Sequence, residues 1–557
     1  MVRALTTGNC HVKVAPLTLR IGLLLAITAT ARAQTHFPPP TASASNPTST
    51  ARALLGKALF WDEQLSSART VACGTCHRPD HGGCDPRAPS ALHPGQDHIL
   101  GTADDVHGSA GVVAQDAGGR YIGDPVFGVR PQVTPRRALS VVNAAYETTL
   151  MWDGRVTNAM HDPRTNANEL PDDAALEQQA VHTPIDPSKM GHQGRTWEDI
   201  GNDLGPLRPL TLASRLPADL AQFTANTTYA ELFERTFGSK GISAARVGMA
   251  IAAYERTLVA DQSPFDLFLA KKGELDPAES RGHALFVTHC ATCHTDLESL
   301  DRPASNDFRR TGVRPVTEDP GRFVATQDPV DLGRFKVPSL RNVALRTPYM
   351  HNGGLPTLSA VLEFYNRGGD FGPGLDPAVC ALRGRLSAAE RDDLIAFLHS
   401  LTDPRLEQEA APFDRPQLWS EGQAVPVRLG CPTSGRSSYA PQIIAVSPPY
   451  RGNRRFTVAA DGAPPGVEHS LVLDFARLPA PGLLLGHPTY LAVSKLRLYG
   501  CGKTCAAADG TGFTSLVFDV PPDPLLVGMR VYGQWFFVDP DGVEGMVSSP
   551  TFSAVVF

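Results

Sequence analysis

The spacing of apolar residues predicts helices in much of the first 412 residues. Two stretches repeat apolar side chains every three to four residues, as on one face of a helix. Their members are Val247, Ile251, Tyr254 and Leu258 in one stretch, and Leu394, Ile395, Phe397, Leu398 and Leu401 in the other. Ser387, followed three residues later by Glu390, is a capping box that begins the second helix. Residues 81–138 and 299–338 are rich in Gly, Pro and Asp, which predicts long irregular loops.

The pattern changes after about residue 412. Short runs of β-branched and aromatic residues recur there between turns rich in Pro, Gly and Asp. These runs occupy residues 456–459, 470–473, 496–499, 515–518 and 552–557. They predict a C-terminal β-sandwich over residues 413–557. The region contains no nucleophile motif or cluster of metal-binding residues, so we interpret it as structural or partner-docking rather than catalytic.

The N-terminus has the pattern of an export signal. Basic residues precede a short apolar run, residues 21–27, and Ala31-Arg32-Ala33 supplies the small residues of a cleavage site. This pattern predicts a signal peptide over residues 1–33 and export, most simply to a bacterial periplasm. The run is too short to span a bilayer, and no later segment approaches eighteen consecutive apolar residues. We therefore predict an exported chain that does not span a membrane.

The charge of the chain gives no reason to propose nucleic acid or an anionic membrane surface as a partner. The formal net charge is −6 over 557 residues, and no basic block interrupts the sequence. Proteins that bind nucleic acid or an anionic membrane surface usually carry a basic patch. We therefore expect no nucleic-acid partner.

Two pentapeptides of the form Cys-x-x-Cys-His carry the candidate chemistry. They are Cys73-Gly74-Thr75-Cys76-His77 and Cys290-Ala291-Thr292-Cys293-His294. Two thiols at this spacing can add across the two vinyl groups of one haem, and the adjoining histidine can give an imidazole nitrogen to the iron. A zinc site would prefer further Cys or His nearby, and a redox thiol pair does not need the histidine. The motifs therefore predict two covalently bound c-type haems.

Similar sequences precede the two motifs. Residues 56–60 read Gly-Lys-Ala-Leu-Phe, and residues 282–286 read Gly-His-Ala-Leu-Phe. The repetition predicts two related haem domains, which we place at residues 34–238 and 239–412. The predicted fold class is therefore mainly α, with two cytochrome c-like haem domains followed by the β-sandwich.

Several motifs in a fixed order resemble the bacterial dihaem cytochrome c peroxidase family, which includes MauG-like enzymes that oxidise residues on partner proteins. Besides the two haem motifs they are residues 55–66, Trp152-Asp153-Gly154-Arg155, residues 335–342 and Pro348-Tyr349-Met350-His351. The resemblance implies an N-terminal haem that reacts with hydrogen peroxide and a C-terminal electron-transfer haem, with His77 and His294 as proximal iron ligands. It also implies electrons from a small redox protein or from oxidised residues of a protein substrate. The alternative is a non-catalytic dihaem electron-transfer cytochrome.

The same resemblance assigns residues near the first haem. His93, sixteen residues after the histidine of the first motif, matches a releasable distal ligand, and its alternative is a solvated loop histidine. Peroxide cleavage also needs a group that moves a proton between the two oxygens. Lys189 stands where the family carries a catalytic glutamate, and an ammonium is a poor proton acceptor near neutral pH. Asp186, Glu177 and His182 are the alternatives for this role.

Two aromatic residues are assigned in the same way. Trp152 corresponds to a tryptophan between the haems, where an oxidisable indole can carry a hole, and its alternative is a buried core residue. Tyr365 corresponds to the distal ligand of the second haem, which is methionine in other peroxidases of the family and tyrosine in MauG-like enzymes. The local pattern predicts a short helix after Thr357 that ends at Gly368. An ordinary core tyrosine, with Met350 as the ligand, is the alternative.

The resemblance further implies calcium between the haem domains. Arg137 occupies the position of the usual asparagine ligand, and the other protein ligands would be backbone carbonyls near Arg346 and Pro348. A guanidinium has no atom that can coordinate a cation. Calcium is therefore an open alternative at this stage.

Overall fold

The computed structural model describes residues 37–557 except for 302–303, 423–426, 435–436, 493–496 and 508–509. The predicted signal peptide, residues 1–33, lies outside the described residues. Helices make up 28% of the chain and strands 20%. The prediction of a mainly α fold is therefore not confirmed, because strands make up a fifth of the chain and most of them lie in the C-terminal region. Among the described residues, no helix is long and apolar enough to cross a membrane.

The first haem motif lies in a helical part of the chain. Its helices are α1 (Thr50–Trp61), α2 (Cys73–Cys76), α3 (Ala175–His182), α4 (Trp197–Leu204), α5 (Ala218–Phe223), α6 (Tyr229–Phe237) and α7 (Ala244–Glu255). Helices α1 and α7 pack closely at Gly56, where an added Cβ would lie 1.8 Å from the carbonyl oxygen of Ala250. Only glycine permits this approach of one helix to the backbone of the other.

The second haem motif lies in a similar helical part. Its helices are α8 (Pro264–Leu269), α9 (Pro277–His289), α10 (Phe323–Thr326), α11 (Leu358–Asn366), α12 (Pro377–Ala381), α13 (Ala388–His399) and α14 (Pro404–Glu407). Helices α9 and α13 meet at Gly282, where an added Cβ would lie 2.0 Å from the carbonyl oxygen of Asp393. Gly56 and Gly282 open the two similar lead-in sequences, so the repetition has a structural reason in both parts.

The sequence patterns for the helices are confirmed. The capping box of α13 forms, since Ser387 N donates to Glu390 Oε2 over 2.8 Å and Glu390 N donates to Ser387 Oγ over 3.3 Å. Val247, Ile251 and Tyr254 of α7 are buried. Small two-stranded antiparallel sheets lie among the loops between helices. They pair β1 (Leu92–His93) with β2 (Val106–His107), β3 (Ala110–Val113) with β4 (Pro131–Val133), β5 (Met160–His161) with β6 (Asn168–Leu170), and β7 (Phe308–Arg309) with β8 (Phe335–Lys336).

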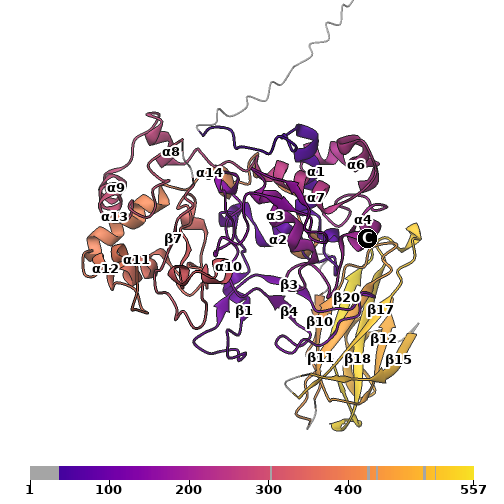
Figure 1. The fold of residues 1–557 in the computed structure, drawn as a ribbon. Helices are drawn as coiled ribbons and strands as arrows, with labels where there is room; N and C mark the ends of the chain where they lie inside the picture. The colour runs from indigo at the N-terminus through magenta and orange to yellow at the C-terminus, as the bar shows by residue number, and fades with distance from the viewer. Residues whose placement is uncertain (1–36, 302–303, 423–426, 435–436, 493–496, 508–509) are drawn as a thin grey trace, which may run out of the picture. The chain divides into compact units, whose positions relative to one another are not determined.

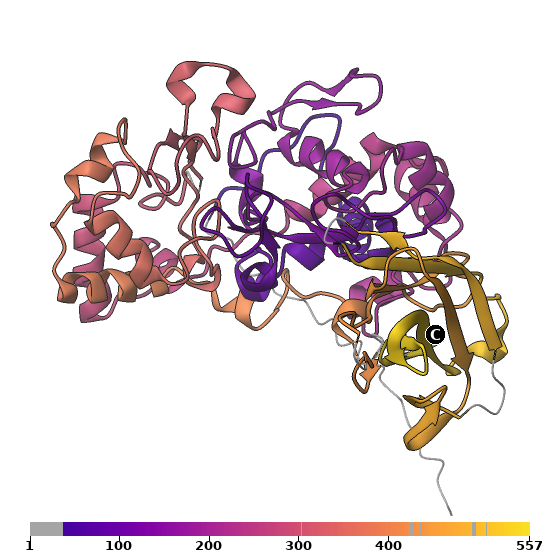
Figure 2. The ribbon, with the colours of Figure 1, turned by 90° about the horizontal axis from the view of Figure 1, so that it is seen from below.

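The C-terminal region is built from antiparallel strands (Figure 1, yellow end of the colour range; Figure 2). The strands are β9 (Val427–Leu429), β10 (Gln442–Val446), β11 (Phe456–Ala463), β12 (Glu468–Asp474), β13 (Arg477–Leu484), β14 (His487–Leu491), β15 (Arg497–Lys503), β16 (Cys505–Ala506), β17 (Gly512–Phe518), β18 (Arg530–Val543), β19 (Met546–Ser548) and β20 (Thr551–Val555). One sheet has the order β10-β11-β17-β16 and another β15-β12-β18-β20-β9. Both contribute to one buried cluster, with Phe456 and Val458 from the first and Leu471, Trp535 and Phe552 from the second.

Candidate functional site

The first haem motif is held by contacts within its own turn. Helix α2 begins after Ala72, whose backbone N–H donates to Thr75 Oγ1 over 2.8 Å. Gly74 lies against the indole of Trp61, where an added Cβ would be 2.2 Å from a ring carbon. Thr75 thus stabilises the turn itself and Gly74 lets it pack against α1, so that Cys73 and Cys76 lie on one turn.

His77 has the orientation of an iron ligand. Its Nδ1 lies 3.1 Å from the carbonyl oxygen of Gly83. Burial lowers the pKa of His77, which favours the neutral imidazole. A neutral ring that donates through Nδ1 leaves the lone pair of Nε2 free for a metal, as in most histidine-ligated sites.

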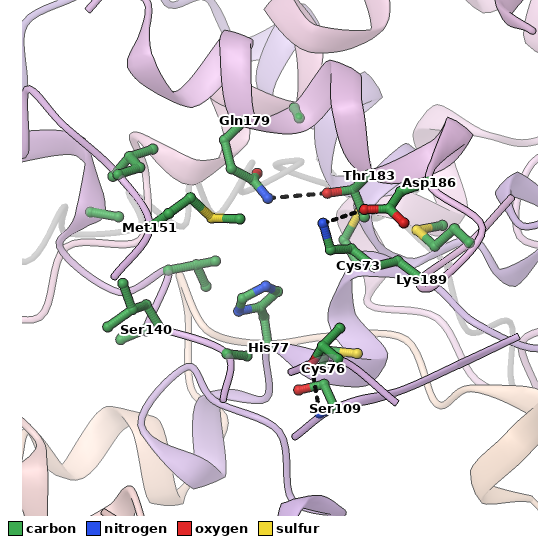
Figure 3. A pocket seen from close by; sticks show the side chains of 18 of the residues that line it. Cys73, Cys76, His77, Ser109, Ser140, Met151, Gln179, Thr183, Asp186 and Lys189 are labelled. Carbon is green, nitrogen blue, oxygen red and sulfur yellow. Dashed lines mark hydrogen bonds and ion pairs between the residues drawn. The ribbon is translucent and has the colours of Figure 1, made fainter. Parts of the chain in front are cut away.

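A cavity of about 300 Å³ lies beside this motif and is lined by Cys73, Cys76 and His77. In Figure 3 the imidazole of His77 points into the space that Gln179, Thr183, Asp186 and Lys189 also border. Most of the remaining lining residues are apolar. A cavity with two thiols and one neutral imidazole converging on it fits a covalently bound haem.

Polar side chains on helix α3 and the turn after it line the cavity beyond His77. The ammonium of Lys189 lies 2.7 Å from Asp186 Oδ2, and Ser188 Oγ donates to Asp186 Oδ1 over 2.7 Å. Partial burial alone would raise the pKa of Asp186, but Lys189 and Ser188 outweigh it and hold that pKa below its usual range. Gln179 Nε2 donates to Thr183 Oγ1 over 3.2 Å. The wall therefore presents a carboxylate that is ionised at neutral pH.

The other two alternatives for proton transfer do not line this cavity. Glu177 is fully buried and accepts two hydrogen bonds from Arg256, at 2.9 and 3.0 Å, and one from Asn46 at 2.7 Å. That arrangement is a closed structural ion pair. His182 is exposed, and its Nε2 lies 2.9 Å from Gln178 Nε2.

Glu255 is a lining residue that the sequence analysis missed. It ends α7, is only 3% exposed and borders the cavity. Its Oε2 has no hydrogen-bond partner among the described residues. Burial, with Glu177 nearby, raises its pKa to about 8. A glutamate at the end of an amphipathic helix gives no signal that distinguishes it from a solvated one.

His93 stands apart from the cavity wall. It lies on β1, where its Nδ1 accepts a hydrogen bond from Gly95 N over 3.1 Å and its ring packs 5.6 Å from that of Phe127. It is absent from the residues that line the cavity. Iron ligation by His93 stays a prediction that would require the β1–β2 loop to move.

Trp152 is buried at the cavity wall. Its Nε1 donates to the carbonyl oxygen of Arg137 over 2.8 Å, and its own carbonyl accepts from Lys336 N over 2.8 Å. Its ring lies 6.2 Å from that of His351. Lys336 and His351 belong to the half of the chain that carries the second haem motif, so Trp152 contacts both halves.

The second haem motif follows α9 directly. The backbone N–H of Cys290 donates to Phe286 over 2.7 Å, and that of His294 donates to Cys290 over 3.1 Å. Burial lowers the pKa of His294 and outweighs a hydrogen bond with the backbone of Pro338, which favours the neutral imidazole. This motif also fits a haem, because two thiols and a neutral imidazole share one turn.

Tyr365 faces the second motif. It lies on α11, which begins after Thr357 as expected, with Ala360 N donating to Thr357 Oγ1 over 3.1 Å. Burial raises the pKa of Tyr365, and the thiols of Cys290 and Cys293 raise it further. The influence of both thiols on this pKa indicates that the phenol lies near Cys290 and Cys293. It stays protonated unless a metal cation takes the place of the proton.

The residues at the expected calcium position do not fit a cation. Arg137 is 6% exposed and its Nη2 donates to the carbonyl oxygen of Arg346, one of the carbonyls expected to bind calcium. Its backbone N–H donates to the carbonyl of His351 over 2.8 Å. A buried guanidinium already occupies the carbonyl that a metal would need.

We expect the haem-loaded protein to show no change in absorption spectrum or melting temperature when calcium or a chelator is added. Arg137→Asn should create calcium binding, detectable by calorimetry, because it frees the Arg346 carbonyl and supplies an amide oxygen. Arg137→Leu is the control, since it removes the cation without adding a ligand. Calcium binding by the unaltered protein would contradict this interpretation.

Comparison with known proteins identifies the family of the chain. A family model described as di-haem cytochrome c peroxidase matches residues 50–274, and a cytochrome c model matches residues 279–402. The chain is 30% identical over 406 residues to the methylamine utilization protein MauG of Methylorubrum extorquens, covering 71% of this chain and 88% of the relative. It is 28% identical over 419 residues to cytochrome-c peroxidase IdrP1 of Pseudomonas strain SCT, covering 68% and 90%. A crystal structure of a MauG-like protein associated with microbial copper homeostasis shares 26% identity, covers 69% of this chain and 97% of its own, and has a TM-score of 0.47.

These features define a dihaem c-type cytochrome enzyme. The chain belongs to the di-haem cytochrome c peroxidase and MauG family. It is accordingly a dihaem peroxidase-like oxidoreductase with two haem cofactors. Both family models end before the strand-rich region, residues 413–557.

Proposed function

We propose that this protein is a periplasmic oxidoreductase that reduces hydrogen peroxide at its N-terminal haem. The observation that carries the proposal is the single cavity that joins the Cys73, Cys76 and His77 motif to the Asp186–Lys189 ion pair. We assign the peroxide-reacting haem to residues 34–238, the electron-transfer haem to residues 239–412, and a β-sandwich to the remainder.

The chain's own residues would hold both haems. The four motif cysteines would form the covalent bonds, and His77 and His294 would each give an imidazole nitrogen to an iron. We assign the phenol oxygen of Tyr365 to the iron of the second haem. Bound haem provides the iron that exchanges electrons with peroxide. The protein determines which iron is accessible and where protons are placed.

Asp186 is the residue that we assign to proton transfer. Reduction of hydrogen peroxide to two waters consumes two electrons and two protons, and cleavage needs a proton moved from one oxygen to the other. A carboxylate at the cavity wall can accept that proton and return it. Lys189 keeps Asp186 ionised through the 2.7 Å contact, so the lysine acts through Asp186 rather than as the base.

Trp152 is the residue that we assign to electron transfer between the haems. It lines the first cavity and contacts Lys336 and His351 of the second half. Electrons would enter from a small redox protein or from oxidisable residues of a partner protein. A phenolate ligand at the second haem favours the higher oxidation states of iron, which supports oxidation of a protein substrate in MauG-like fashion.

A non-catalytic electron-transfer cytochrome is the second candidate function. The observation that favours it is Lys189 at the position of the expected glutamate. The two functions differ in what the fully reduced protein does with peroxide. Under anaerobic conditions, we expect one molecule of hydrogen peroxide to oxidise both haems of one protein molecule. Haems that stay reduced would support the electron carrier instead.

We also expect mass spectrometry to find two haems covalently retained after acid–acetone extraction of protein made with the haem-attachment machinery. Replacing Cys290 and Cys293 by alanine should leave one retained haem. Cys380→Ala is the matched control, because Cys380 is exposed and outside both motifs, and it should leave two. Fewer than two haems in the unaltered protein would overturn the assignment of the motifs.

A further inference from the structure

The strand-rich region contacts one hairpin of the first haem part. Strands β3 and β4 are joined by residues 114–130, and this connection meets β11 and β17. The hydroxyl of Thr457 on β11 donates to the carbonyl oxygen of Gly119 over 2.9 Å. The hydroxyl of Ser515 on β17 donates to the carbonyl oxygen of Tyr121 over 3.2 Å. Two adjacent strands thus bind the backbone of the hairpin.

The contact is also apolar and closely packed. Val113, Tyr121 and Ala459 form one buried cluster, with exposures of 6%, 3% and 0%. Gly123 lies against the ring of Phe513, where an added Cβ would be 3.0 Å from a ring carbon. The hairpin is therefore held on a specific surface of the sheets.

The same hairpin supports the polar wall of the cavity from behind. Val112 N on β3 donates to the carbonyl oxygen of Lys189 over 2.9 Å. Next to it, a Cβ on Gly111 would lie 2.4 Å from the carbonyl oxygen of Ser188. Only glycine lets β3 lie this close to the turn that carries Asp186 and Lys189.

A second link runs through Gln115, which is 2% exposed. Its Nε2 donates to Ser67 Oγ, and Ser67 N donates to the carbonyl oxygen of Met190 over 2.8 Å. Both ends of the turn 188–190 are therefore tied to residues 110–115.

We infer that the strand-rich region is a structural part of the peroxide site, and that Thr457 and Ser515 are positioning residues for the turn 186–190. They act through the β3–β4 hairpin, which transmits the constraint to the backbone of Lys189. This inference rests on the proposed function in one respect, the role of Asp186 in moving a proton during peroxide cleavage. The mechanical coupling itself concerns residues on the described chain and can be measured without peroxide.

Hydrogen–deuterium exchange on the haem-loaded full chain tests the coupling. The amides of Lys189, Met190 and Gly191 all donate to the carbonyl of Asp186, and the amide of Val112 donates to Lys189, so all four report on this turn. Thr457→Val combined with Ser515→Ala removes two hydrogen bonds while nearly keeping side-chain volume. We expect these amides to exchange about tenfold faster, because two net hydrogen bonds are lost. The reaction with peroxide should slow in the same variant, with haem content unchanged.

Thr514→Val is the matched control. Thr514 lies on β17 beside Ser515, but its hydroxyl lies 2.8 Å from His469 Nε2 rather than from the hairpin. It should leave exchange at 186–191 unchanged, and Thr457→Ser should keep it near the unaltered rate. If the double variant does not fold, Thr457→Val alone serves in its place. The inference is wrong if residues 113–121 exchange faster while 186–191 do not, or if Thr514→Val has an equal effect. If exchange rises but the peroxide reaction is unchanged, the coupling stands and the role assigned to this turn in the proposed function fails.

Discussion

Replacing Asp186 by asparagine is expected to slow the reaction of the diferric protein with hydrogen peroxide by about 10²- to 10⁴-fold, the usual contribution of a positioned acid–base group. The amide keeps the size of the side chain but cannot accept and return a proton. Stopped-flow absorption of the Soret band measures the rate. Asp162→Asn is the control, because it removes the same charge from a residue outside the cavity wall. An unchanged rate in Asp186→Asn would show that another group performs the proton transfer.

The role of Lys189 predicts a pH dependence. In the unaltered protein the pKa of Asp186 lies below its usual range, so the carboxylate persists as pH falls below the ordinary aspartate value. Lys189→Met removes the ammonium, so the pKa of Asp186 rises, because only the hydrogen bonds from Ser188 then oppose the effect of partial burial. The acid limb of the rate profile should therefore move to higher pH, while the rate well above it stays near that of the unaltered protein. A uniform loss of rate at all pH values would mean that the lysine acts directly.

Replacing Tyr365 by methionine is expected to raise the reduction potential of the second haem by on the order of 0.1 V or more, within the roughly 0.8 V over which axial ligands set haem potentials. A thioether favours the ferrous state, whereas a phenolate favours the ferric state. A redox titration measures the potential, and the absorption of a methionine–iron bond should appear in the variant.

Met350→Leu is the control for this assignment, since Met350 is the alternative ligand in the turn before α11. It should leave the potential and the spectrum unchanged. If the unaltered protein already shows a methionine–iron absorption that Met350→Leu abolishes, the tyrosine assignment is wrong. The preference for oxidation of a protein substrate would then lose its support.

The parts of the site that the sequence reveals are those held within a few consecutive residues. Each haem motif places its thiols and imidazole on one turn, so Cys73, Cys76 and His77 could be identified without a structure. Gly56 and Gly282 were visible as a repeat, although their reason, the contact with Ala250 and Asp393, required the packed helices.

Contacts that depend on the folded backbone could not be predicted. The sequence shows Lys189 as a departure from the family pattern, but its 2.7 Å contact with Asp186 requires the turn that brings these two residues together. Glu255 looked like an ordinary helix-end glutamate. Tyr121, whose carbonyl oxygen accepts the hydrogen bond from Ser515, lies in a region rich in Gly, Pro and Asp. No periodicity there indicates a packing partner.

The most direct test of the account is the addition of one equivalent of hydrogen peroxide to the purified diferric protein with both haems attached. The account predicts that the Soret band of the N-terminal haem changes rapidly and that the peroxide is consumed. If both Soret bands stay unchanged, and the fully reduced protein also consumes no peroxide, the protein is an electron carrier and the proposed function is wrong.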